Sequence, residues 1–414
     1  MISTRLSVID EIFLRTHRGY GIPIALQGIW RTTETVGREE LGRVHDELAI
    51  GQLGRRVGKS HIPGARLRWD ISSESLPLDY SPDAIDDIIG WADAQADVRL
   101  DPQYGPGWRL TAAPLTHGGT VVSLVCSHAL ADARGLIDAA AQAFSGTSTP
   151  VRPAGSDARD AFATVLTVLV RCIAATARLW VSKKARAELR AFTTADTGGI
   201  APHRARQMHS VIMDIDAAEW DSAARRMGGS ANSLFVAVVA ATMSELGSPA
   251  VTVDIPFRTG SGDANAIAMA TVAVRGDDSP AAIRAACKAA FGKPVGAPAG
   301  YPPEIVQLLP HRVAAKLTSN PGRGEVLCSN IGDIPDAVHA LGPHRSCGLA
   351  TRAIHPNPAG ELATIRMSTY ISRMDGNYTL SLVCTDDALV GSPAELTAAV
   401  RRALAPQNLA GKPW

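Results

Sequence analysis

The sequence predicts an α/β protein made of two subdomains, each with a mixed sheet flanked by helices. Its 414 residues exceed the usual size of one hydrophobic core. Segments of strand and helix character alternate through the first third, and the same alternation returns in the second half. Polar stretches at 146–157 and 193–203 enclose one long helical segment. We therefore expect an N-terminal unit at 1–192, a C-terminal unit at 193–414, and a bridging helix at 158–192.

The first half supplies the elements of the N-terminal unit. A polar, proline-containing stretch covers 74–83, and the run Thr120–Cys126 is apolar on both faces, as in a strand inside a sheet. Asp132 then precedes a helical pattern at Ala133–Phe144 whose apolar residues share one face. The other expected elements are a helix around Val8–Phe13, an apolar stretch at Ile22–Ile29, a helix at Glu39–Ala49 and a short helix near Ile85–Trp91.

The second half has the same kinds of strand and helix patterns, but no sequence repeat relates the two halves. Its closing helix begins with a capping box, Ser392 to Glu395, and has proline at its first helical position. Helices are also expected at Ala217–Arg226 and Ser233–Glu245. Strands are expected at Met208–Ile215, Ala250–Phe257, Ile267–Val274, Glu325–Asn330, Thr364–Ser372 and Tyr378–Cys384.

The composition is that of a folded globular protein, with 46% apolar and 20% charged residues. The 41 Lys and Arg nearly balance the 40 Asp and Glu, so no charge signature of nucleic-acid binding is present and no nucleic-acid partner is expected. No two cysteines have zinc-ligand spacing, which predicts reduced core thiols. Acidic residues interrupt the N-terminus before a signal-peptide core can form. We expect a cytoplasmic protein without a metal or other cofactor.

The segment Ala161–Val181 is apolar enough to suggest a membrane helix. Arg171 and Arg178 interrupt it, and each would cost about 2.5–3.5 kcal/mol at the centre of a bilayer. A buried or surface-lying helix is therefore expected, which leaves open peripheral contact with the inner membrane surface.

Several familiar motifs fail. The stretch Gly54–Ser60, GRRVGKS, has three residues between its glycines where a phosphate-binding loop needs four. No Gly-x-Ser-x-Gly elbow and no glycine trio of a dinucleotide fold occurs. His128 and Asp132 have a spacing that suits a shared metal, but no third ligand lies nearby in the sequence.

His128 lies between the apolar strand and the next helix, at a strand end where open α/β sheets bind ligands. A histidine is suited to general-base work because its unperturbed pKa is about 6.5. The alternative interpretation is a hydrogen-bonded core histidine, with Asp132 serving only as the N-cap of the helix.

The stretch Ser127–Ala133, SHALADA, resembles the HHxxxDG motif of the superfamily of chloramphenicol acetyltransferase and condensation domains. The opening segment Arg5–Leu14, RLSVIDEIFL, looks most like that of bacterial polyketide-associated acyltransferases and wax ester synthase/diacylglycerol acyltransferases. Gly107–Leu110, GWRL, precedes the motif strand as it does in those groups. Asp254–Arg258, DIPFR, and Cys328–Gly332, CSNIG, resemble later segments of the superfamily. Two positions depart from the motif, where its first histidine is Ser127 and its glycine is Ala133.

The resemblance implies a pseudo-dimer of chloramphenicol acetyltransferase-like subdomains with an active-site tunnel between them. His128 would be the catalytic base, and Asp132 would pair structurally with Arg258. Ser127 and Asn330 are candidates for the substrate channel. The open alternatives are a solvated Arg258 and a turn role for Asn330.

The implied activity is O-acyl transfer from a thioester, acyl-CoA or acyl carrier protein, to a hydroxylated lipid or small-molecule acceptor in lipid or polyketide-lipid biosynthesis. Two alternatives remain. One is an amide-forming condensation enzyme, and the other is a catalytically degenerate acyl- or lipid-binding protein of the same fold.

Overall fold

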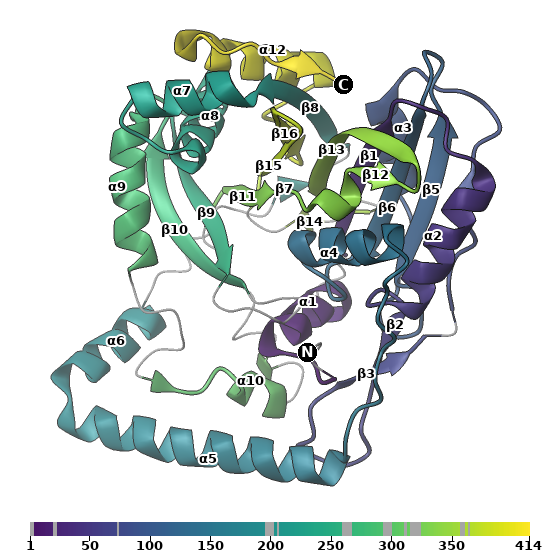
Figure 1. The fold of residues 1–414 in the computed structure, drawn as a ribbon. Coiled ribbons are helices and arrows are strands. Elements are labelled where there is room, and N and C mark those ends of the chain that lie inside the picture. Colours follow the sequence, from purple (N-terminus) through teal and green to yellow (C-terminus); the bar gives the residue numbers. More distant parts are fainter. Residues whose placement is uncertain are drawn as a thin grey trace.

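The computed structural model describes residues 4–19, 23–72, 74–194, 203–204, 207–258, 267–292, 300–309, 313–314, 324–356, 361–362 and 365–414. It shows a mixed α/β arrangement with two large sheets and helices packed around them (Figure 1). The first sheet has six strands in the order β12 (Ala340–Leu341), β13 (His344–Ile354), β1 (Ala25–Thr32), β6 (Thr120–Ser127), β5 (Trp108–Pro114) and β4 (Asp79–Tyr80).

The second sheet has seven strands. Their order is β10 (Ile267–Arg275), β9 (Ala250–Arg258), β11 (Val326–Asp333), β15 (Met367–Met374), β16 (Asn377–Cys384), β8 (His209–Asp216) and β17 (Lys412–Pro413). Two small pairs complete the described strands, β2 (Arg55–Gly58) with β3 (Arg68–Ile71), and β7 (His203–Arg204) with β14 (Glu361–Leu362).

The helices of the first half are α1 (Val8–Gly19), α2 (Arg38–Ile50), α3 (Ile88–Ala96), α4 (Ala133–Phe144), α5 (Asp157–Val181) and α6 (Lys183–Thr194). Those of the second half are α7 (Ala217–Arg226), α8 (Ala231–Glu245), α9 (Pro280–Phe291), α10 (Ile305–Leu308) and α12 (Pro393–Leu404), with short 3-10 turns at Asp336–Val338 and Ala405–Gln407. Five helices begin within two residues of the expected positions: α2, α4, α7, α8 and α12. Helix α1 extends to Gly19, beyond its expected end, and α9 and α10 are additional to the expected helices.

Strand β6 lies in the interior of the first sheet, as its apolar run predicts. All eight of its residues are buried, and it pairs with β1 on one side and β5 on the other. Helix α4 follows it after a short turn and buries Leu136 and Ile137 against the same core. The buried strand β6 and the amphipathic helix α4 thus fix both ends of the turn that carries His128.

The first sheet is completed by strands from the second half of the chain. Strand β13 pairs antiparallel with β1 from Ala25 opposite Ile354 to Thr32 opposite Ser346. Strand β12 adds the outer edge through β13. The unit boundary predicted between residues 192 and 193 stays a prediction, and the first sheet needs strands from both sides of it.

The bridging segment expected as one helix over 158–192 is instead two helices, α5 and α6. Ser182 separates them with an extended backbone, φ −113° and ψ 114°, and its hydroxyl accepts a hydrogen bond from the Ala185 amide at 3.2 Å. Arg186 donates to the carbonyls of Leu179 and Trp180 at 2.7 and 2.9 Å. A serine cap and an arginine on the last carbonyls thus end α5, because both satisfy groups that a continuous helix would bond internally.

The short helix expected at Ile85–Trp91 begins later, at Ile88. The Asp87 side chain accepts a hydrogen bond from the Gly90 amide at 2.8 Å and so caps the first turn. Ile85 instead forms a parallel bridge with Leu115. The cap, rather than the first apolar residue, sets where the helix begins.

Candidate active site

His128 directly follows the last residue of β6. Its backbone amide donates to the Ile24 carbonyl at 2.9 Å. The residue after Ile24 is Ala25, which begins β1 and lies opposite Ser127. The backbone at His128 is therefore held by the sheet, while the residue itself begins the turn into α4.

The imidazole ring of His128 stacks on Phe13 of α1. The two ring centroids are 3.6 Å apart and the planes are inclined by 16°. Burial lowers the pKa of His128 to about 4; a hydrogen bond with its own backbone acts in the opposite direction, and the nearby His355 lowers the pKa further. At neutral pH the ring is uncharged, which is the state that a general base needs.

The turn after His128 is fixed by hydrogen bonds. Ser127, which is buried, accepts from the Ala129 amide through its hydroxyl at 3.4 Å, and its carbonyl accepts from the Leu130 amide at 2.9 Å. Arg55 of β2 donates to the Leu130 carbonyl at 2.6 Å, and its guanidinium lies 3.9 Å from the centre of the Trp69 ring. The Ser127 hydroxyl thus has a role within the turn, and its predicted place in a substrate channel stays a prediction.

Gly107, in the GWRL stretch, allows a close approach to this turn. Its carbonyl accepts from the Ser127 amide at 2.9 Å. A Cβ atom at Gly107 would lie 2.5 Å from a methyl carbon of Leu130. A side chain at this position would therefore displace Leu130, which is part of the turn.

Asp132 is the N-cap of α4. One of its carboxylate oxygens accepts from the Gly135 amide at 2.6 Å, and only 4% of the residue is exposed. Ala133 is the first residue of the helix, so the alanine that replaces the motif glycine needs no left-handed backbone. Arg258 is the last residue of β9. Its side chain lies outside the described residues, and the pair with Asp132 stays a prediction.

A different contact joins the first turn of α4 to the second half. Arg134 donates to the carbonyls of Ile331 and Asp333 at 3.4 and 2.8 Å. Both acceptors belong to β11, the strand that also carries Asn330. This contact places the end of β11 beside the motif helix.

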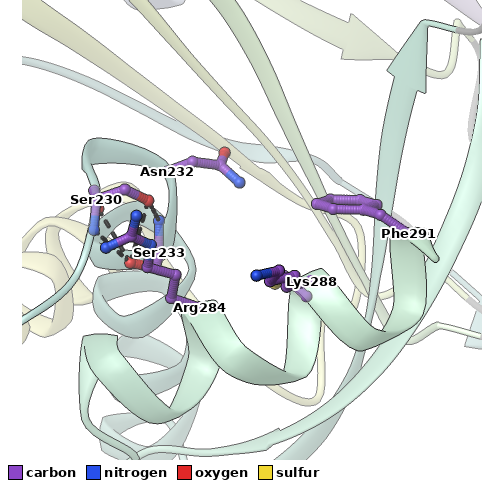
Figure 2. A pocket seen from close by; sticks show the side chains of 7 residues that line it. Ser230, Asn232, Ser233, Arg284, Lys288 and Phe291 are labelled. Atoms are coloured by element: carbon purple, nitrogen blue, oxygen red, sulfur yellow. Dashed lines mark hydrogen bonds between the residues drawn. The ribbon is translucent and has the colours of Figure 1, made fainter.

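Asn330 is exposed at a register irregularity of β11. Its side-chain oxygen accepts from the Gly332 amide at 2.9 Å, and its side-chain nitrogen donates to Asn232 at 3.2 Å. Asn232 lines a pocket of about 270 Å³ between the first turn of α8 and α9 (Figure 2). The Asn330 side chain therefore both stabilises the turn through Gly332 and contacts a residue that lines the pocket. The pocket lining is Ser230, Asn232, Ser233, Arg284, Cys287, Lys288 and Phe291.

His355 is a second histidine at the site, and the sequence analysis missed it. Strand β1 lies between β6 and β13 and is antiparallel to both, so the carboxyl ends of β6 and β13 meet at one edge of the sheet. Ala25 faces Ser127 on one side and Ile354 on the other. His128 and His355 each directly follow one of these residues, and a positive charge on His355 opposes protonation of His128.

We expect the variant His355→Gln to shift the pH dependence of His128. Removing a like charge lets the pKa of His128 rise, so the acidic limb of the activity profile moves to higher pH while activity near pH 7 is unchanged. A kcat/KM profile that extends from about pH 3 to pH 8 covers the acidic limb and measures this shift. A variant that loses activity equally at every pH would show that His355 acts by another route.

Cys126, two residues before His128, does not form a nucleophilic pair with it. Burial raises the pKa of this thiol, and the negative charge of Asp132 raises it further, against the opposing effect of Arg55. The thiol therefore stays protonated and unreactive. In the described ranges of the chain, no three His, Cys, Asp or Glu side chains are grouped as metal ligands.

The missed residues left only weak traces in the sequence. Arg55 lies inside the stretch that resembles a phosphate-binding loop, and the structure makes that stretch a β-strand that braces the His128 turn. His355 follows Leu349–Ile354, a mostly apolar segment that contains Arg352, and its place at the end of this segment was the available sign. Phe13 lies in the opening segment that supports the family resemblance.

Comparison with known proteins identifies the fold. No family model and no curated protein matches the sequence. Among solved structures, the wax ester synthase/diacylglycerol acyltransferase of Marinobacter aquaeolei VT8 superposes with a TM-score of 0.57 at 11% identity, covering 98% of this chain and 100% of that one. The first condensation domain of the CDA synthetase gives a TM-score of 0.58 at 12% identity, covering 99% and 98%.

The condensation domain of the monacolin K polyketide synthase gives a TM-score of 0.58 at 11% identity and covers 97% of this chain and 96% of that domain. Similarity at these identities establishes the fold. The chain thus has the two-subdomain α/β architecture of condensation domains and wax ester synthase, as the resemblance to the chloramphenicol acetyltransferase superfamily predicts.

Proposed function

We propose that this protein is a thioester-dependent acyltransferase in which His128 is the general base. The observation that carries the proposal is the position of the His128 ring, which stacks on Phe13 at the end of a buried central strand. Burial also lowers the pKa of His128, which keeps the ring uncharged at neutral pH. The neighbouring thiol of Cys126 stays protonated, which favours direct transfer over a covalent acyl-enzyme.

In the proposed step, the acceptor hydroxyl loses its proton to His128 as its oxygen attacks the thioester carbonyl carbon. The carbon–sulfur bond then breaks, and the protonated ring returns the proton to the leaving thiolate. The products are an ester and a free thiol. No oxidant, metal or other cofactor enters this balance.

The proposed donor is acyl-CoA or an acyl carrier protein, and the proposed acceptor is a hydroxylated lipid or polyketide-derived molecule. Support comes from the opening segment of α1, which resembles lipid-type acyltransferases and supplies the ring that stacks on His128. The similar fold of a wax ester synthase agrees with ester formation. The donor and the acceptor would enter a tunnel between the two halves from opposite faces. The proposed location of the protein is the cytoplasm.

A thiol-release assay tests the function. Short- to long-chain acyl-CoA donors, and the same acyl groups on a carrier protein, are offered with alcohols, diacylglycerol or amines in separate reactions. We expect thiol release that depends on a hydroxyl acceptor. Release that requires an amine would favour amide formation. Absence of release with every pair, together with a melting temperature raised by acyl donors, would favour an acyl-binding protein.

A further inference from the structure

Helix α5 presents an apolar stripe to solvent. Eight of its large apolar side chains are between 44% and 85% exposed. Several recur at helical spacing, so one continuous face is apolar along almost the whole helix. Figure 1 shows α5 running along one edge of the molecule, away from both large sheets. The eight are Phe162, Val165, Leu166, Leu169, Val170, Ile173, Trp180 and Val181.

The opposite side of α5 is attached to the body of the protein. Asp157 bonds Arg5 at 2.5 Å, and Asp160 bonds Arg66 at 2.7 Å, so both acids of the first turn are held. Further along, Arg171 pairs with Glu304 at 3.2 Å. The buried positions on this side are Ala161, Thr164, Val168 and Ala175. The apolar stripe is therefore held in place by the fold and faces outward.

Positive charge gathers at the carboxyl-terminal end of this stripe. Between residues 178 and 190 the sequence has five basic residues and one acidic residue, although the whole chain has a net charge of only +1. Lys183 and Lys184 are exposed directly beyond Trp180, which is 82% exposed. An aromatic residue beside lysines at the end of an apolar face is typical of helices that lie at a membrane surface.

The same residues argue against a membrane-spanning arrangement. By length and composition α5 could cross a bilayer, and only 17% of its most apolar window is buried. However, Arg171 and Arg178 lie within that length, and the body of the protein occupies one side of the helix. A helix that lies in the plane of the interface keeps its arginines in water and buries only the stripe.

We propose that α5 docks this protein onto an anionic membrane surface, with the Phe162 to Val181 stripe in the headgroup region and the basic residues against acidic lipids. An apolar face could bind either a membrane or a second copy of the chain, and the local charge favours the membrane. Acidic lipid complements the local positive charge, whereas a second copy of this nearly neutral chain brings the same basic cluster with it. The proposal is independent of the acyl-transfer chemistry.

Vesicle flotation of the full chain tests the proposal. We expect binding to vesicles of phosphatidylcholine mixed with phosphatidylglycerol, weaker binding in high salt, and little binding to phosphatidylcholine alone. The double variant Leu169→Ser, Ile173→Ser should lower partitioning at least about tenfold because it removes apolar area that enters the interface. The matched control is Ile71→Ser, which changes an equally exposed isoleucine on β3, 63% exposed against 61% for Ile173.

A second variant, Lys183→Glu with Lys184→Glu, tests the charge without touching the stripe. It should reduce binding to the anionic vesicles and weaken the salt dependence. Equal binding by wild type and both variants would overturn the proposal, as would no binding of wild type to anionic vesicles. A wild-type dimer in sedimentation velocity that the Leu169→Ser, Ile173→Ser variant disperses would assign the stripe to a second copy instead. Unchanged melting temperatures show that the variants are folded.

Discussion

Replacing His128 with alanine is expected to lower thiol release about 10²-fold or more, because a positioned base contributes roughly 10² to 10⁴ in rate. The ring is uncharged at neutral pH and fixed by Phe13, so its loss removes the proton acceptor. Wild-type activity should itself fall as the pH drops through about 4, where the ring becomes protonated. Initial rates of thiol release at several pH values measure both effects.

The control for this experiment separates chemistry from packing. His117→Ala removes a histidine whose side chain is 96% exposed, and it should retain full activity. His128→Asn keeps more of the volume beneath Phe13 and should be as inactive as the alanine variant. If the asparagine variant recovered wild-type rates, the ring would be a packing residue, and the general-base assignment would fail.

The strand, turn and helix around His128 could be predicted because their patterns are local. Eight consecutive buried residues define β6, and the apolar face of α4 begins one residue after its capping Asp132. Helix α4 starts and ends at the predicted residues. A capping residue followed by apolar residues at helical spacing defines where a helix begins.

The pairing of β1 with β13 could not be predicted in the same way. Strand β13 comes more than 300 residues after β1 in the chain, yet the two pair along their length. Apolar content indicates a strand but does not say which sheet it joins, because pairing depends on the topology of the whole molecule. His355 was missed for this reason, as its importance follows only from the register that brings β13 beside β1.

Arg55 illustrates a second limit. Its contact with the Leu130 carbonyl joins residues 75 apart, and its stacking on Trp69 requires the β2–β3 pair to form. A motif search considers only the spacing of glycines and lysine around it. The physical role of the side chain is set by burial beneath the turn, which no local pattern encodes.

The variant Asp132→Asn is expected to lower the free energy of unfolding by about 3–5 kcal/mol, because the predicted partner Arg258 would be left without its counter-charge. Asparagine still offers an oxygen to the Gly135 amide, so the cap that the structure shows is retained. If Asp132 is a helix cap and not a member of an ion pair, the variant Asp132→Ala removes the cap alone. The free energy of unfolding would then fall by only about 0.5–2 kcal/mol. Urea unfolding followed by circular dichroism distinguishes these magnitudes.

A matched control and a double variant make the test of the pair specific. Asp216 caps α7 through the Glu219 amide at 2.9 Å and is exposed, so Asp216→Asn should change stability little. If Asp132 and Arg258 are paired, the variant Asp132→Asn, Arg258→Gln should be clearly more stable than the sum of the two single effects predicts. Additive effects would instead leave Asp132 as a helix cap alone. Arg134 and its two carbonyl acceptors in β11 would still join the motif helix to the second half.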